Sequence, residues 1–178
     1  MMNVMFCIPL PDGNISLRPF SVDDVERTYE WVSNPWYTGE FAGSAAPTPE
    51  SHRKYFKSVL ADCGQVFLAV CVDGTHIGNA GLKYFNGASC ECWYYIGDEA
   101  QRGRNYANAI VRLLCRVAFS VKGIECVRAR VLTTNLKSSR ALLSNGFEEC
   151  GMFSDKKGGD FVIYEKRKCQ DEHREPFA

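Results

Sequence analysis

The chain has 178 residues, of which 46% are apolar, and this is enough for one domain with a sizeable core. Lysine plus arginine and aspartate plus glutamate both number 21, so net charge does not favour nucleic acid or an anionic membrane as a partner. No apolar run reaches the length of a membrane span, and no secretory leader pattern opens the sequence. We therefore expect a soluble, cytoplasmic domain with no nucleic-acid or membrane partner.

The nine cysteines predict reduced core thiols rather than a metal site. Five of them lie within apolar segments that are expected to be strands or a helix: Cys71, Cys90, Cys92, Cys115 and Cys126. One pair is closely spaced, Cys90 with Cys92, and the histidines do not supply a second ligand pair at the spacing of a zinc site. We expect no bound metal.

The N-terminal segments predict a strand followed by a helix. Residues 15–20 alternate between apolar and polar side chains, as a strand does. Ser21 and Asp24 have the spacing of a capping box, which marks the start of a helix. This helix must end before Pro35, because the residue preceding a proline avoids the helical region. Residues 36–47 are expected to form a loop.

A second helix and a three-stranded meander are expected next. Thr48 is typical of a helix N-cap when a proline follows it, and Gly64 marks the end of that helix. Asp73-Gly74 and Asn86-Gly87 are strong hairpin signals, because both central residues of such a turn need positive φ. Residues 65–96 are therefore predicted to be an antiparallel meander.

The remaining elements alternate between helix and strand. Apolar residues at helical spacing predict a helix over 107–118. A strand is expected at 126–132 and a short helix at 135–147, where Asn145-Gly146 is a C-cap signal. Two final strands are expected at 148–153 and 161–167.

The resulting order, βαα-βββ-α-β-α-ββ, predicts an α+β fold with a mixed, largely antiparallel sheet flanked by helices. The strand–helix–strand unit at 88–132 predicts a right-handed crossover that gives one parallel pair. An exposed strand edge near 161–167 suggests pairing with a second copy, so a homodimer is a further hypothesis.

The run Arg102-Gly103-Arg104-Asn105-Tyr106-Ala107 opens the helix predicted at 107–118. A helix N-terminus presents unpaired amides and partial positive charge, and both suit a phosphate. The alternative is a solvated turn with Asn105 as N-cap. The run lacks the spacing of a Walker loop and of a dinucleotide fingerprint.

This run resembles the acyl-CoA pyrophosphate loop, [QR]-x-x-G-x-[GA], of the GCN5-related N-acetyltransferases, with Asn105 at the first glycine. A second segment, from Asn135 to Phe147, resembles the N-x-x-[SA]-x7-G-F segment of that family, with Ser138 and Gly146 in register. The resemblance covers about residues 15–168. It implies a single acyltransferase domain over 1–178 with short terminal extensions.

Ser138, with Trp31 and Asn34-Pro35 near the end of the first helix, is similar to one branch of the family. That branch acetylates ribosomal-protein N-termini, nucleotide-activated amino sugars and polyamines. The resemblance implies transfer of an acetyl group from acetyl-CoA to a primary amine, of a small molecule such as a nucleotide-linked amino sugar or of a protein N-terminus, by direct attack on the thioester. The alternatives are a catalytically weak CoA-binding sensor or interaction module and, less favoured, a small zinc-bound domain.

The resemblance also implies where acetyl-CoA binds. Backbone groups near Tyr94, Tyr95 and Ile96 would hold the pantetheine arm and polarise the carbonyl, as oxyanion donors do. Asn135 would contact the pantetheine. The expected cofactor-binding residues are Tyr94, Tyr95, Ile96, Arg102, Gly103, Arg104, Asn105, Tyr106, Ala107, Asn135 and Ser138.

Two residues are expected to be catalytic. Many family members have a tyrosine that acts as the acid at the position of Leu142, so Ser138 is the nearest matched polar group to the sulfur. The alternative is that Ser138 satisfies the backbone at the start of the helix. Strand alternation puts Glu91, Trp93 and Tyr95 on one face, where a partly desolvated carboxylate is a stronger base. The alternatives are a surface cross-strand partner at Glu91, or no base at all, because α-amines have a pKa of about 8.

The acceptor is expected to bind between loops 33–47 and 154–160. Aromatic side chains there suit a sugar, a nucleotide or a peptide, and the shortage of carboxylates ranks a polyamine lower. The expected substrate-binding residues are Trp36, Tyr37, Phe41, Glu91 and Trp93.

Overall fold

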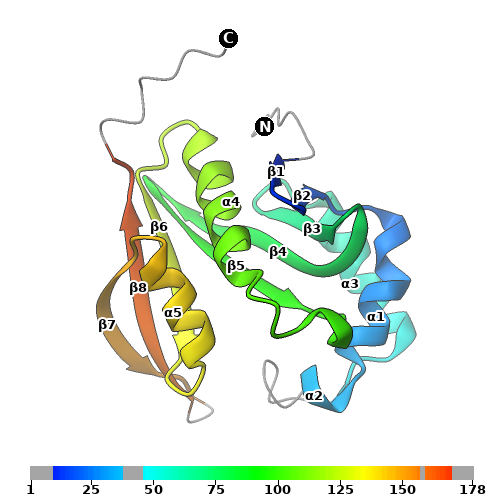
Figure 1. Cartoon of the computed structure of the whole chain (residues 1–178). Helices are drawn as coiled ribbons and strands as arrows, with labels where there is room; N and C mark the ends of the chain where they lie inside the picture. The colour runs from blue at the N-terminus through cyan, green and yellow to red at the C-terminus, as the bar shows by residue number, and fades with distance from the viewer. Residues whose placement is uncertain (1–9, 38–45, 157–158, 170–178) are drawn as a thin grey trace.

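The computed structural model describes residues 10–37, 46–156 and 159–169, which form one sheet with helices on both faces (Figure 1). The sheet order is β1-β2-β3-β4-β5-β6-β8-β7. The strands are β1 (Leu10–Asp12), β2 (Ile15–Pro19), β3 (Val66–Val72), β4 (Thr75–Asn86), β5 (Ser89–Ile96), β6 (Cys126–Leu132), β7 (Glu148–Ser154) and β8 (Asp160–Arg167). The helices are η1 (Val22–Asp24), α1 (Val25–Val32), α2 (Pro35–Tyr37), α3 (Pro49–Ala61), η3 (Glu99–Gln101), α4 (Ala107–Ser120) and α5 (Leu136–Ser144).

The predicted α+β architecture is confirmed, and so is the single parallel pair that β5 and β6 form on either side of α4. Three short elements were not predicted: β1, which pairs with β2; α2, a helical turn that Pro35 begins; and the 3-10 turn η3 before α4. The expected strand edge near 161–167 was wrong. β8 is hydrogen-bonded to β6 on one side and to β7 on the other, so this segment offers no edge for a second copy.

The two hairpin turns differ in detail. Asp73 and Gly74 have φ values of 47° and 79°, as the Asp-Gly signal predicts. At the second hairpin Asn86 remains in β4 and pairs with Ser89, so the turn residues are Gly87 and Ala88. The register of β4 shifts between Lys83 and Asn86, and this irregularity displaces the turn by one residue.

Each face of the sheet packs against its own helices. Apolar residues of α4 and α5 meet the sheet on one face and form the larger buried cluster, which includes Leu113, Leu114 and Leu142. The opposite face packs against the α1 and α3 side through a smaller cluster that includes Phe20 and Phe56. Figure 1 shows α4 and α5 in front of the sheet and α3 behind it. The sheet therefore lies between two separate apolar clusters, one on each face.

The five cysteines expected in the core are buried: Cys71, Cys90, Cys92, Cys115 and Cys126. Burial raises the pKa of the Cys90 thiol to about 12, so this thiol stays protonated. Within the described ranges, no helix is long and apolar enough to cross a membrane.

A buried polar chain ties the start of α1 to the sheet. Arg18 donates two hydrogen bonds to the Asp24 carboxylate, at 2.6 and 2.7 Å. The Ser21 amide also donates to Asp24, at 2.9 Å, which is the acidic half of the predicted capping box. His76 comes next, with Nδ1 3.1 Å from Asp24 Oδ1 but outside hydrogen-bonding geometry, and with Nε2 2.9 Å from Asn79 Oδ1. Burial alone would raise the pKa of Asp24, but the bonds from Arg18 and Ser21 outweigh it and lower the pKa to about 2.

We expect Asp24→Asn to lower the free energy of unfolding at pH 7 by about 2 kcal/mol, because the ionised carboxylate is more stable in the folded state. Since the folded-state pKa is depressed, this stability is present above about pH 4 and is lost as the pH falls toward 2. Urea unfolding between pH 3 and pH 7 measures the difference. Wild type should lose more stability than the variant, and parallel pH curves would contradict the assignment.

Candidate functional site

The strands β5 and β6 part halfway along β5. Their parallel pairing runs from Ser89 to Glu91, whereas β5 continues to Ile96 and β6 to Leu132. β4 stays paired with β5 as far as Ile96, and β8 stays paired with β6 as far as Leu132, so each strand keeps its outer partner beyond the split. On the side facing β6, the backbone of residues 92–96 has no paired strand in the described structure. An extended ligand can make strand-like hydrogen bonds there.

The loop before α4 opens beside this split. Gly103 and Asn105 both have positive φ, at 77° and 61°, and Tyr106 then takes up helical angles as the N-cap residue. Alternation of left-handed and right-handed residues turns successive amides toward one point, which suits an anion. Asn105 thus adopts the backbone form for which its position normally uses glycine. The alternative in which Asn105 is the N-cap was wrong, because Tyr106 holds that position.

The two arginines of the loop also bond to the protein's own backbone. Arg102 donates to the carbonyl oxygens of Ile96 and Gly97, at 3.2 and 2.7 Å, and its guanidinium stacks 3.4 Å from the centre of the Trp36 ring. Arg104 donates to the Ala100 carbonyl at 3.1 Å and is exposed. Arg102 therefore fixes the end of β5 against α2. The N–H groups of Arg102 that donate to these two carbonyls are not available to a phosphate.

The first turn of α5 lies across the split from β5. Asn135 is the N-cap, and its side-chain oxygen accepts from the Ser138 amide at 3.1 Å. The Ser138 hydroxyl lies 3.1 Å from the Tyr94 hydroxyl. Leu142 is 1% exposed and packs in the core, so no acidic side chain occupies its position. The polar groups on this side of the split are thus a hydroxyl pair and an amide.

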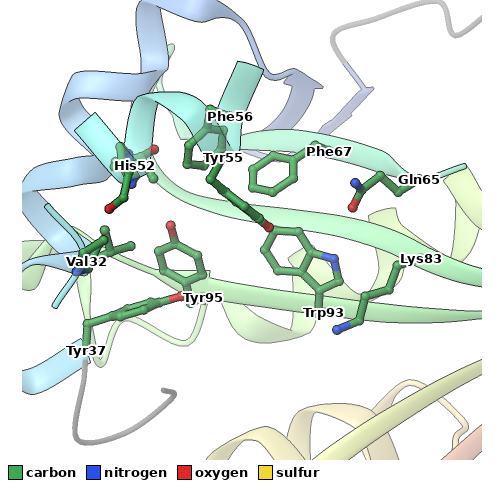
Figure 2. A pocket seen from close by; sticks show the side chains of 13 residues that line it. Val32, Tyr37, His52, Tyr55, Phe56, Gln65, Phe67, Lys83, Trp93 and Tyr95 are labelled. Atoms are coloured by element: carbon green, nitrogen blue, oxygen red, sulfur yellow. The ribbon is translucent and has the colours of Figure 1, made fainter. Parts of the chain in front are cut away.

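A cavity of about 500 Å³ opens on the other face of β5, between the sheet and helices α1 and α3. Its described lining is largely aromatic: Thr28, Val32, Tyr37, Pro47, Ser51, His52, Tyr55, Phe56, Gln65, Phe67, Lys83, Trp93 and Tyr95. Figure 2 shows Trp93 and Tyr95 rising from the sheet, with Lys83 and Gln65 at the end away from His52 and Val32. Tyr37 and Trp93 line the cavity as expected, whereas Trp36 does not. Phe41 lies outside the described residues.

Glu91 does not have the surroundings expected of a general base. Arg130 holds its carboxylate with two bonds, at 2.6 and 2.9 Å, and Lys83 Nζ lies 3.5 Å away. Both carboxylate oxygens therefore face cations of the protein itself. Glu91 belongs to an ion-pair cluster that includes Lys83, its cross-strand neighbour on β4, which fits the alternative of a cross-strand partner at this position. The cluster contains two cations and one anion.

The floor of the cavity is tied to the buried polar chain. Asn79 is fully buried and donates to the hydroxyl oxygens of Thr28 and Tyr95, at 3.1 and 2.6 Å. Tyr95 thus presents its side chain to the cavity while its backbone belongs to the split strand. Desolvation raises the pKa of Tyr37 to about 12 and raises that of Tyr95, so both phenols remain protonated.

His52 is a lining residue that sequence patterns did not indicate. Its Nε2 is 3.0 Å from the Val25 carbonyl oxygen and must be the donor, because a carbonyl only accepts. Burial lowers the pKa of His52, and this effect outweighs the bond to Val25. The ring is therefore neutral near pH 7, with an Nδ1 lone pair able to accept a proton. Tyr55, Gln65 and Lys83 were also missed, because their elements meet only in the folded sheet.

The described residues contain no group of three histidine, cysteine, aspartate or glutamate side chains able to hold a metal ion. Likewise, none of the described residues of the 154–160 loop lines the cavity, although that loop was expected to do so. What the described residues bring together is a split strand, a loop whose backbone suits an anion, and an aromatic cavity. All three meet at β5.

Residues 14–148 match the family described as Acetyltransferase (GNAT) domain, and the chain belongs to that family. This confirms the resemblance drawn from the two sequence motifs. The chain matches no curated protein.

Several solved structures share the fold. AAC(6')-Ib bound to paromomycin and acetyl-CoA is 21% identical, with a TM-score of 0.76 over 87% of this chain and 94% of that one. Spermidine N-acetyltransferase from Vibrio cholerae, bound to CoA and spermine, is 15% identical, with a TM-score of 0.77 over 88% and 96%. A GNAT-family acetyltransferase from Bacillus anthracis is 16% identical, with a TM-score of 0.76 over 88% and 96%. At these identities the likeness shows the fold.

The positive φ of Asn105 predicts how substitutions there behave. Asn105→Ala should lower the free energy of unfolding by about 1 kcal/mol, because a residue with a Cβ and no polar compensation disfavours this region. Asn105→Gly should leave stability unchanged or raise it slightly. Urea unfolding of the two variants tests this, and equal loss of stability in both would contradict the left-handed assignment.

Proposed function

We propose that the protein is an acetyl-CoA-dependent N-acetyltransferase that acts on a primary amine. The observation that carries this proposal is the parting of β5 from β6 beside the anion-binding loop at 103–107. The split supplies an exposed strand backbone for an extended amide-containing arm, and the loop supplies amides for a pyrophosphate. Acetyl-CoA has both parts, and its chemical contribution is an acetyl group activated as a thioester.

The residues of the chain then have separate tasks. Backbone groups at Tyr94, Tyr95 and Ile96 hold the arm, and an amide among them faces the thioester oxygen as charge develops. Gly103, Arg104, Asn105, Tyr106 and Ala107 bind the pyrophosphate. Asn135 contacts the arm from α5, and Ser138 hydrogen-bonds the sulfur. Arg102 serves mainly to hold the loop in place through its bonds to Ile96 and Gly97.

The acceptor enters from the aromatic cavity on the opposite face of β5. Its described lining contains several rings and one lysine but no carboxylate. A polycationic amine needs carboxylates to bind to, whereas an aromatic base or sugar stacks on rings and an acidic group pairs with Lys83. We therefore favour a nucleotide-linked amino sugar, with a protein N-terminus as the second candidate.

A CoA-binding sensor with the same fold is the alternative function. Leu142 in place of an acidic tyrosine and Asn105 in place of glycine are the features that favour it. The two functions differ in one observable, because an enzyme releases the thiol of CoA when an amine is present and a sensor only binds.

We expect acetyl-CoA to raise the melting temperature in a saturable way, well beyond ATP at equal concentration, because only the folded protein binds it. Free CoA is the second control. Thiol release is then measured with a panel of amines: nucleotide-linked amino sugars, peptides with free N-termini, spermidine and kanamycin. Saturable stabilisation without thiol release from any amine would support the sensor, and no stabilisation at millimolar ligand would contradict both functions.

Lys83→Met should raise the KM for an acidic acceptor about tenfold and change kcat little, because the charge-assisted bond is made before and during the reaction. Lys122→Met, an exposed lysine beyond the end of α4, is the matched control and should leave KM unchanged. Initial rates against acceptor concentration give both constants. An unchanged KM for the acidic acceptor in Lys83→Met, or a preference for spermidine, would contradict the assigned acceptor class.

A further inference from the structure

The hydroxyl groups of Tyr94 and Ser138 form a contact that crosses the split. Tyr94 belongs to the part of β5 that has left β6, and Ser138 belongs to the first turn of α5, which follows β6 along the chain. Their oxygens lie 3.1 Å apart. Tyr94 is half-buried and packs against the core on the α4 and α5 face, with its hydroxyl directed at Ser138. The contact therefore fixes both hydroxyls at the split.

We propose that Tyr94 orients the Ser138 hydroxyl toward the departing sulfur. The pair then takes the place of the tyrosine that acts as general acid in many family members, at the position where this chain has Leu142. Ser138 is the catalytic residue of the pair, and Tyr94 is a positioning residue that acts through it. This inference rests on the proposed function, because it concerns the leaving group of the same reaction.

Hydrogen-bond chemistry sets the direction of the two bonds. A serine hydroxyl has one hydrogen and two lone pairs. If Tyr94 donates its hydrogen to Ser138 Oγ, the Ser138 hydrogen is left to point elsewhere, and a sulfur that gains negative charge is a strong acceptor for it. The incoming bond also polarises the serine hydroxyl and makes it a better donor. A tyrosine hydroxyl that kept donating to solvent could not orient Ser138 in this way.

The electronic state of Tyr94 suits a donor that keeps its proton. Burial raises the pKa of Tyr94, and the bond with Ser138 only partly opposes this. The phenol therefore stays protonated throughout the working pH range, and no proton needs to leave it. The amine nitrogen bonds to the acyl carbon, the carbon–sulfur bond breaks with its electron pair on sulfur, and the amine proton goes to water. The pair stabilises the thiolate as it leaves.

Two kinetic variants test the pair. Ser138→Ala should lower kcat with a turned-over amine about a hundredfold, the lower end of the range for loss of one preorganised donor or acid, and Tyr94→Phe about fivefold. The double variant should be no slower than Ser138→Ala, because Tyr94 acts only through Ser138. Ser138→Thr should restore most of the rate. Tyr164→Phe, a buried tyrosine of β8, is the matched control and should stay within about twofold.

A second measurement needs no acceptor. The thiol of bound CoA is titrated by the ultraviolet absorbance of its thiolate, and an ordinary thiol has a pKa of about 8.5. In wild type the pair should lower this pKa, and both Ser138→Ala and Tyr94→Phe should return it toward the value in free CoA. Additive losses of kcat in the double variant, or a thiol pKa that neither substitution changes, would overturn the inference.

The titration also separates this inference from the proposed function. If wild type binds CoA, lowers the pKa of its thiol and turns over no amine, the proposed acetyl transfer is wrong, while the contact of the pair with the sulfur stands. If wild type acetylates an amine but the two variants behave like Tyr164→Phe, the function stands and the pair has no such role. Absence of CoA binding would overturn both.

Discussion

The parting of β5 from β6 after Glu91 is the constraint on which the rest of the site depends. β4 holds β5 along its length, and β8 holds β6, so the two strands separate without either losing its outer partner. Side chains then alternate along the freed strand. Tyr94 faces α5, while Trp93 and Tyr95 face the aromatic cavity. A pair of strands bonded to their ends would cover the backbone between these two sets of side chains and would leave no path from one to the other.

Two charged residues that were expected in the site, Arg102 and Glu91, bind other groups of the protein. Arg102 bonds to the backbone at the end of β5 and stacks on Trp36, and Glu91 lies between Arg130 and Lys83. A carboxylate whose oxygens already contact two cations is poorly placed to act as a general base. Among the described lining residues of the cavity, Lys83 is the charged side chain, and this is the basis on which we propose an acidic rather than a polycationic acceptor.

Local signals predicted most of the fold, because turns, caps and strand alternation act within a few residues. Asp73-Gly74 forms the expected turn, Thr48 accepts from the Ser51 amide as an N-cap should, and the motif at 102–107 opens α4. What failed depended on partners distant in sequence. Arg130, which donates to the Glu91 carboxylate, is 39 residues away in the sequence. β7 covers the side of β8 that was expected to be an edge. Lys83 and His52 line the same cavity only because α3 packs on the face of the sheet that contains β4.

The most direct measurement is a crystal structure of the protein with acetyl-CoA. We expect the pantetheine arm between β5 and β6, bonded to the backbone of residues 94–96, with the pyrophosphate on the amides of 103–107 and the sulfur beside Ser138. The acetyl group should point toward Tyr95 and the aromatic cavity. Acetyl-CoA bound on another surface, or a split closed by renewed pairing of β5 with β6, would contradict the proposed site.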